Sequence, residues 1–182
     1  MPRPRLQAVL LVDGYNVIGA CSSLQKTRDR DGLEVSRHEL IEALVNYSAS
    51  EDLETRIIFD AHYQDGQSNS ETITPKLSIH YTNFGQTADT YIEKLCASLR
   101  HEVDGVRYRV IVATSDRAQQ LTVVGYGAEW MSAQKLLDAV EATTCRRRKQ
   151  HRTNKQSSSR FLVNSLDPRS QQLLAQWRKG LS

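Results

Sequence analysis

The sequence predicts an α/β domain built on a central, mainly parallel sheet flanked by helices, and two observations support this fold class. Short apolar segments alternate along the chain with longer segments in which apolar residues recur at helical spacing. The first apolar segment, Ala8–Val12, is continuous, which is typical of a strand covered on both faces. Strands that alternate with helices are joined by crossovers and therefore pair in parallel.

The expected strands are short segments rich in β-branched and other apolar residues. They lie at Val9–Val12, Arg56–Phe59, Leu77–Tyr81, Tyr108–Ala113 and Ala128–Met131. The polar segment between Asp60 and Thr72 has no such pattern, so we expect a surface loop there.

The expected helices begin at residues that commonly cap helix N-termini. Ser36 and Glu39 have the spacing of a capping box, and Thr87 and Ser132 are further candidate caps. Apolar residues then recur at helical intervals in the segments 36–48, 87–102, 116–127 and 132–150.

The length and charge of the chain suggest one domain with a basic tail. Within 182 residues we expect a domain over residues 6–150 and a basic linker and C-terminal helix over residues 151–182. Residues 146–182 carry ten Lys or Arg and one acid, a net charge of +9; because the whole chain carries +3, residues 1–145 carry −6. Basic clusters favour phosphate backbones, whereas concentrated carboxylates favour metal ions.

Several classes of protein are not favoured by the sequence. We expect no membrane segment, because no apolar run approaches the roughly 20 residues of a membrane span. Three widely spaced cysteines and the lack of a signal-peptide pattern indicate reduced thiols in a cytoplasmic protein, without a disulfide-linked partner. The five histidines lack metal-site spacing, and no dinucleotide-binding glycine motif, Walker lysine loop or nucleophile elbow is present in the sequence.

Four aspartates occupy corresponding places in the expected layout. Asp13, Asp60 and Asp116 follow strands, and Asp89 lies in the first turn of the helix that Thr87 begins. Each alone is also explained by turn chemistry or by the preference of acids for helix N-termini. Because parallel strands bring their carboxyl ends to one edge, we expect the four to converge there. Clustered carboxylates repel one another unless a cation is present, and they suit Mg²⁺ or Mn²⁺.

Neighbouring polar residues extend this candidate site. Glu93 lies one helical turn beyond Asp89 and is a possible additional member. Asn16 is placed to orient water or phosphate, and Ser115 and Arg117 to contact the scissile backbone.

The motifs around these residues resemble the YacP-like family of NYN domains. The segments that carry the resemblance are "LLVDGYNVIGA", "IIFDAH", "TADTYIEKL" and "VATSDRAQQ", and the closing "LDPRSQQLLAQWRKG" is similar to the family's C-terminal tail. The resemblance implies a PIN-like fold, metal-dependent ribonuclease activity and mRNA cleavage in association with ribosomes. The matching acidic positions are Asp13, Asp60, Asp89 and Asp116.

These observations lead to a first hypothesis, a metal-dependent endoribonuclease. Asp13, Asp89 and Asp116 would hold Mg²⁺ or Mn²⁺, and Asp60 would assist directly or through water. Phosphates of RNA or of the ribosome would be contacted by the basic positions Arg146, Arg147, Arg148, Lys149 and Arg152. The alternative is a non-catalytic RNA- or ribosome-binding adaptor; a phosphatase or DNA nuclease with the same acids ranks below both.

Overall fold

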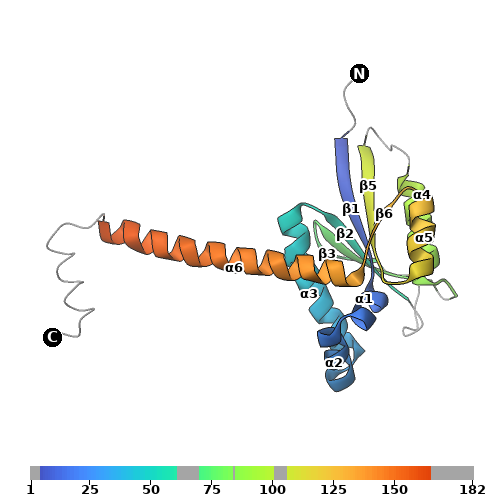
Figure 1. Ribbon diagram of the computed structural model, residues 1–182, viewed down its shortest axis with the longest axis horizontal. Helices are drawn as coiled ribbons and strands as arrows, with labels where there is room; N and C mark the ends of the chain where they lie inside the picture. Colours follow the sequence, from blue (N-terminus) through green and yellow to red (C-terminus); the bar gives the residue numbers. More distant parts are fainter. Residues whose placement is uncertain (1–4, 61–69, 84, 101–105, 165–182) are drawn as a thin grey trace. The chain divides into compact units, whose positions relative to one another are not determined.

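A six-stranded sheet forms the centre of the protein (Figure 1). The computed structural model describes residues 5–60, 70–83, 85–100 and 106–164, and within these ranges it describes all side chains except those of residue 5 and residues 151–164. The strand order is β3-β4-β2-β1-β5-β6, and every neighbouring pair is parallel except β3 with β4. The strands are β1 (Arg5–Asp13), β2 (Glu54–Phe59), β3 (Ser70–Thr74), β4 (Leu77–Tyr81), β5 (Val106–Ala113) and β6 (Glu129–Met131). The predicted fold class is confirmed.

The strands agree with the sequence prediction except at one edge of the sheet. Leu77–Tyr81 has the expected bounds, and the other four predicted strands differ from the observed ones only at their ends. The prediction of a loop up to Thr72 was wrong for β3, whose residues 70–73 are exposed and show no apolar alternation. Pairing with β4 creates this strand, so the local sequence gave no signal for it. Residues 61–69 of the expected loop lie outside the described residues.

Helices cover both faces of the sheet and make a three-layer structure. They are α1 (Gly14–Ala20), α2 (Ser22–Asp31), α3 (Leu33–Glu51), α4 (Ala88–Leu99), α5 (Arg117–Gly125) and α6 (Ala133–Asn164). Helices α4 and α5 cover one face, and α1, α2, α3 and the first turns of α6 cover the other (Figure 1). Consecutive residues of β1 alternate between the two cores, with Leu10 in one and Leu11 in the other, which explains its continuous apolar sequence.

The helix starts show which predicted caps are used. Thr87 is the N-cap of α4 and accepts a hydrogen bond from Thr90 N at 3.2 Å, as expected. The prediction for Ser36 was wrong, because α3 begins three residues earlier and buries Ser36 inside the helix. There its hydroxyl donates to the Leu24 carbonyl at 2.9 Å and joins α3 to α2. Tertiary packing therefore overrides a local capping signal.

Helix α6 is longer than predicted. It continues from Ala133 through residues 151–164, where we expected a linker, so the change in composition at residue 151 does not end the helix. The chain divides into two units, residues 1–143 and residues 144–182, and the sheet belongs to the first. The predicted last helix, after Asp167, lies outside the described residues. None of the helices described here is both long enough and apolar enough to cross a membrane.

Candidate active site

A cleft of about 370 Å³ opens at the carboxyl edge of the sheet. Strands β1, β2 and β5 are adjacent and parallel, so their carboxyl ends meet at this edge. Asp13 is the last residue of β1, Asp60 follows β2, and Asp116 follows β5. The residues that line the cleft are Asp13, Tyr15, Asn16, Asp60, Thr87, Ala88, Asp89 and Asp116. The four aspartates predicted to converge therefore share one cleft.

Asp13 is the most buried of the four acids. Its side chain caps α1 and accepts a hydrogen bond from Asn16 N at 3.0 Å, and only 8% of the residue is exposed. Burial raises the pKa of Asp13 from 3.8 to about 6, and repulsion from Asp89, Asp116 and Asp60 adds to the rise, against the lowering effect of the Asn16 amide. A buried anion among other anions is costly unless a cation joins it.

The glycine after Asp13 is required by packing. A Cβ at Gly14 would overlap the ring of Phe59, which is fully buried beneath α1. Tyr15 then packs on the same ring, with centroids 5.1 Å apart, and its hydroxyl accepts a hydrogen bond from Arg37 Nη1 at 3.3 Å. This packing holds the turn that carries Asp13 and Asn16 into the cleft.

Asp116 and Asp89 come from two neighbouring helices. Asp116 caps α5 by accepting hydrogen bonds from the amides of Ala118 and Gln119 at 2.7 and 3.1 Å. Asp89 lies in the first turn of α4 and accepts a 2.6 Å hydrogen bond from the side chain of Gln119. The pKa of Asp89 is raised by partial burial and by the negative charges of Asp116, Glu93 and Asp60.

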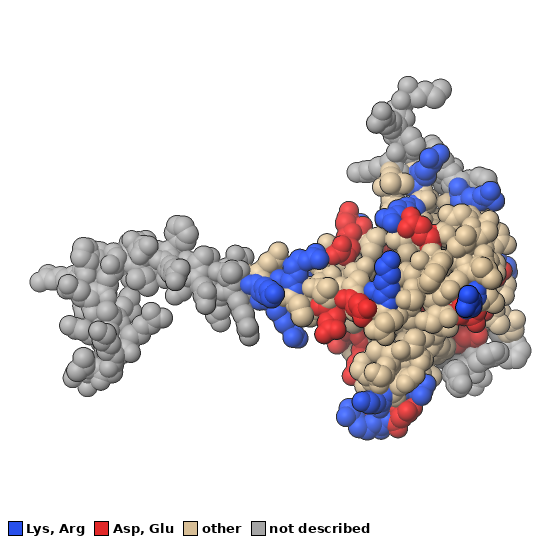
Figure 2. All heavy atoms as spheres, in the orientation of Figure 1, with Lys and Arg blue, Asp and Glu red and all other residues tan. Residues whose placement is uncertain are grey.

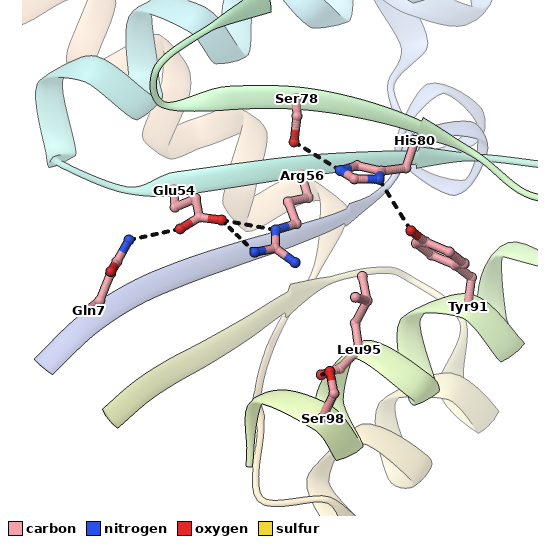
Figure 3. Close-up of polar contacts among 8 residues, drawn as sticks. All are labelled: Gln7, Glu54, Arg56, Ser78, His80, Tyr91, Leu95 and Ser98. Carbon is pink, nitrogen blue, oxygen red and sulfur yellow. Dashed lines mark hydrogen bonds and ion pairs between the residues drawn. The ribbon is translucent and has the colours of Figure 1, made fainter. Parts of the chain in front are cut away.

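A polar contact fixes the start of α4 on the sheet (Figure 3). His80 of β4 shares hydrogen bonds with the hydroxyls of Ser78, at 2.9 Å, and Tyr91, at 3.2 Å. Burial and the nearby Arg56 guanidinium lower the pKa of His80, so the neutral ring is favoured. Since Tyr91 lies two residues beyond Asp89, this contact helps to set the position of the Asp89 carboxylate.

The predicted substrate-contacting residues have different positions. Asn16 lines the cleft, and its Oδ1 accepts a 2.6 Å hydrogen bond from Ser115 N, which joins α1 to the loop after β5. The Ser115 hydroxyl accepts from Ala133 N at 3.3 Å and so contacts the start of α6. Among the described residues, the cleft lining does not include Ser115, Arg117 or Glu93. Their contacts with substrate stay predictions.

Asp60 lies at the cleft and is partly buried. It accepts a hydrogen bond from Thr82 Oγ1 at 3.4 Å, which connects the end of β2 to the segment after β4. The residues that follow Asp60, including His62 and Tyr63, lie outside the described residues.

The basic positions belong to the second unit. Residues 146–149 are exposed on α6, and Figure 2 shows their Lys and Arg side chains grouped on that helix. Only the backbone of Arg152 is described.

One residue beside the cleft, Gln119, was not predicted from the sequence. Gln119 is 3% exposed, and its side chain joins α5 to Asp89 of α4. Gln119 lies three residues after Asp116, which is the spacing of a capping box, and in that motif its side chain would accept a hydrogen bond from the Asp116 amide. That amide instead donates to Thr114 Oγ1 at 3.1 Å, which leaves the Gln119 side chain available to Asp89.

The cleft provides suitable oxygen donors for a divalent cation, although not a closed cage. In the part of the chain that the structure describes, no three His, Cys, Asp or Glu side chains are close enough to form a metal-binding group. Mg²⁺ keeps several of its waters and is commonly held by one or two carboxylates, so an open set of four aspartates fits its chemistry. The buried Asp13, with its raised pKa, is the donor for which a cation would relieve most repulsion.

Comparisons with known proteins identify the family to which this arrangement belongs. The sequence profile of the YacP-like NYN domain matches residues 10–179. The chain belongs to this family. NYN domains are generally nuclease-like and RNA-binding, with a PIN-like ribonuclease fold, and PIN-like nucleases usually use divalent metals.

Relatives of this YacP-like chain match nearly its whole length. It is 32% identical over 173 residues to the uncharacterized protein YacP of Bacillus subtilis (strain 168), which covers 94% of this chain and 97% of that protein. The crystal structure of Rae1 (YacP) from Bacillus subtilis matches with a TM-score of 0.64 and 30% identity over 94% of this chain and 95% of that one. A tryptophan-to-leucine mutant of that protein matches with a TM-score of 0.65 and 29% identity over 92% and 98% of the respective chains.

Proposed function

We propose that this protein is a metal-dependent endoribonuclease that cleaves RNA in the acidic cleft. The observation that carries the proposal is the burial of Asp13 in a cleft lined by three further aspartates, which raises its pKa to about 6. A fold needs no buried carboxylate among carboxylates at this position, since the same helix cap could be made by Asn. The acids are better explained by a cation that they bind together.

On this proposal, Asp13, Asp89 and Asp116 would hold Mg²⁺ or Mn²⁺, in part through the waters that the ion keeps, and Asp60 would assist from the end of β2. A bound divalent cation would supply a water activated for attack and would stabilise negative charge on the phosphate. Asn16 holds the loop after β5 through Ser115 N, and Tyr15 lines the cleft, where its ring can contact a base of the substrate.

The basic residues of α6 add affinity for the RNA backbone. Residues 146–149 are four consecutive cations, and contacts with phosphates do not depend on sequence. From the family resemblance we infer that the substrate is mRNA, cleaved in association with the ribosome in the cytoplasm.

A second candidate function is a non-catalytic RNA- or ribosome-binding adaptor. It is favoured by the lack, within the described residues, of any three potential ligands close enough to form a metal group. On that proposal the acids shape an RNA-binding surface, and the basic helix supplies the affinity.

Cleavage of labelled single-stranded RNA with Mn²⁺, and with chelator instead, separates the two candidates. We expect cuts only with metal. Asp89→Asn should lower the cleavage rate by more than about 100-fold and retain RNA binding, since mutating a residue that only supports a metal ligand already lowers activity by about 10–100-fold. Asp138→Asn is the matched control, because Asp138 is an exposed acid on α6 that does not line the cleft. RNA binding without metal-dependent cuts would favour the adaptor, and preferential cleavage of DNA would contradict the proposed substrate.

A further inference from the structure

The side chain of Gln119 is almost fully buried, and only one of its two hydrogen-bonding groups has a partner. Its Nε2 donates to Asp89 Oδ1 at 2.6 Å, a short hydrogen bond. Its Oε1 has no hydrogen-bond partner, the one buried side-chain atom of this kind among the described residues. A buried acceptor without a partner is unfavourable, so a residue chosen for stability alone would not be a glutamine here.

The geometry points to Gln119 as a positioning residue that holds Asp89 for a divalent cation, an inference that rests on the proposed function. Through its backbone amide and its side chain, Gln119 bonds both Asp116 and Asp89, and thus joins the acids of α5 and α4. A bond to Asp89 Oδ1 leaves the second carboxylate oxygen available to a ligand.

The charge of the cleft explains why a neutral donor occupies this position. Lys or Arg would also donate to Asp89, but its positive charge would compensate the carboxylate and repel the incoming cation. The glutamine amide orients the carboxylate and leaves its charge unchanged. The amide orientation is fixed as well, because turning it would place Oε1 against Asp89 Oδ1, two acceptors in contact.

The test is calorimetric titration of Mn²⁺ into metal-free, full-length protein, a measurement independent of cleavage. Gln119→Met keeps the side-chain volume and removes both the donor and the unsatisfied acceptor. We expect its Mn²⁺ affinity to fall about 10–100-fold, while its urea midpoint in chelator is unchanged or higher. A residue that served only the fold would instead lower the urea midpoint. Gln119→Leu is measured in parallel, so that the test can be made with either variant if only one of them folds.

Two further variants show whether Gln119 acts through Asp89. Gln134→Met is the matched control, because Gln134 donates a comparable 2.8 Å hydrogen bond to Asp138 on the exposed side of α6. It should bind Mn²⁺ as the wild type does. In an Asp89→Asn background, adding Gln119→Met should change the remaining affinity by less than about twofold, since coupled residues are not additive.

The outcomes separate this inference from the proposed function. Wild-type protein that does not bind Mn²⁺ would overturn the metal-dependent mechanism and the inference with it. Wild-type binding with an unchanged affinity in Gln119→Met would overturn the role of Gln119 alone. An equal loss with and without Asp89, or failure of both Gln119 variants to fold, would also overturn it.

Discussion

Replacing Asp13 by Asn should stabilise the metal-free protein at neutral and basic pH. Asp13 is 8% exposed, and its folded-state pKa is about 6 against an ordinary value of 3.8. Because the folded state holds the proton more tightly, the wild type loses stability as the pH rises from about 4 through 6. A shift of about 2 pKa units corresponds to about 3 kcal/mol at pH 8.

The substitution removes this cost and keeps the local structure. Asn has the same shape, and as an N-cap it can accept the hydrogen bond from Asn16 N as Asp13 does. The free energy of unfolding of Asp13→Asn should therefore exceed that of the wild type by about 3 kcal/mol at pH 8, with the difference vanishing near pH 4. Asp138→Asn, which changes the same charge at an exposed position, should show no such difference.

Urea unfolding in chelator at pH 4 and pH 8 measures both values. A variant that is less stable than the wild type at pH 8, or a difference that does not change with pH, would refute the reasoning. Adding Mn²⁺ at pH 8 should then stabilise the wild type more than the variant, because a cation that binds only the folded state adds to its stability. Equal stabilisation of the two proteins would show that Asp13 is not a ligand.

Other predictions follow from packing, thiol burial and charge. Gly14→Ala should lower the free energy of unfolding by about 1–3 kcal/mol or more, because the new methyl group meets the Phe59 ring. In urea unfolding, combining Gly14→Ala with Phe59→Leu should recover part of this loss, and strictly additive losses would contradict this account. Burial raises the pKa of Cys96 to about 11, so a thiol-reactive dye at pH 8 should label the exposed Cys145 long before Cys96. Equal labelling rates of the two cysteines would contradict the burial of Cys96. Changing all four cations of 146–149 to Gln should weaken RNA binding and reduce the slope of log affinity against log salt by about 3–4; an unchanged slope would exclude these phosphate contacts.

Local signals in the sequence were sufficient for most of the sheet and for the acids. Short segments rich in β-branched and other apolar residues marked the five parallel strands, and Thr87 was identified as a cap because it acts within its own helix turn. Since parallel strands end at one edge, the positions of Asp13, Asp60 and Asp116 along the chain predicted a shared cleft, which the structure contains.

Features that depend on a distant partner could not be predicted in this way. Strand β3 is polar and exposed, and it forms only because β4 offers a free edge. Ser36 has the sequence pattern of a helix cap but lies inside α3, where its hydroxyl donates a hydrogen bond to the Leu24 carbonyl of α2. Helices α1 and α2 are short, and no helix was predicted in their segments.

The sequence by itself determined which segments become the five parallel strands and that three aspartates follow strands while Asp89 begins a helix, because these properties depend on a residue and its near neighbours. Only the tertiary structure decided how deeply Asp13 is buried, that Gly14 must leave room for Phe59, and that Gln119 bonds to Asp89 thirty residues away in sequence. Burial and electrostatic repulsion arise from groups brought together by folding, and their strength depends on separation in space, which the order of residues does not specify.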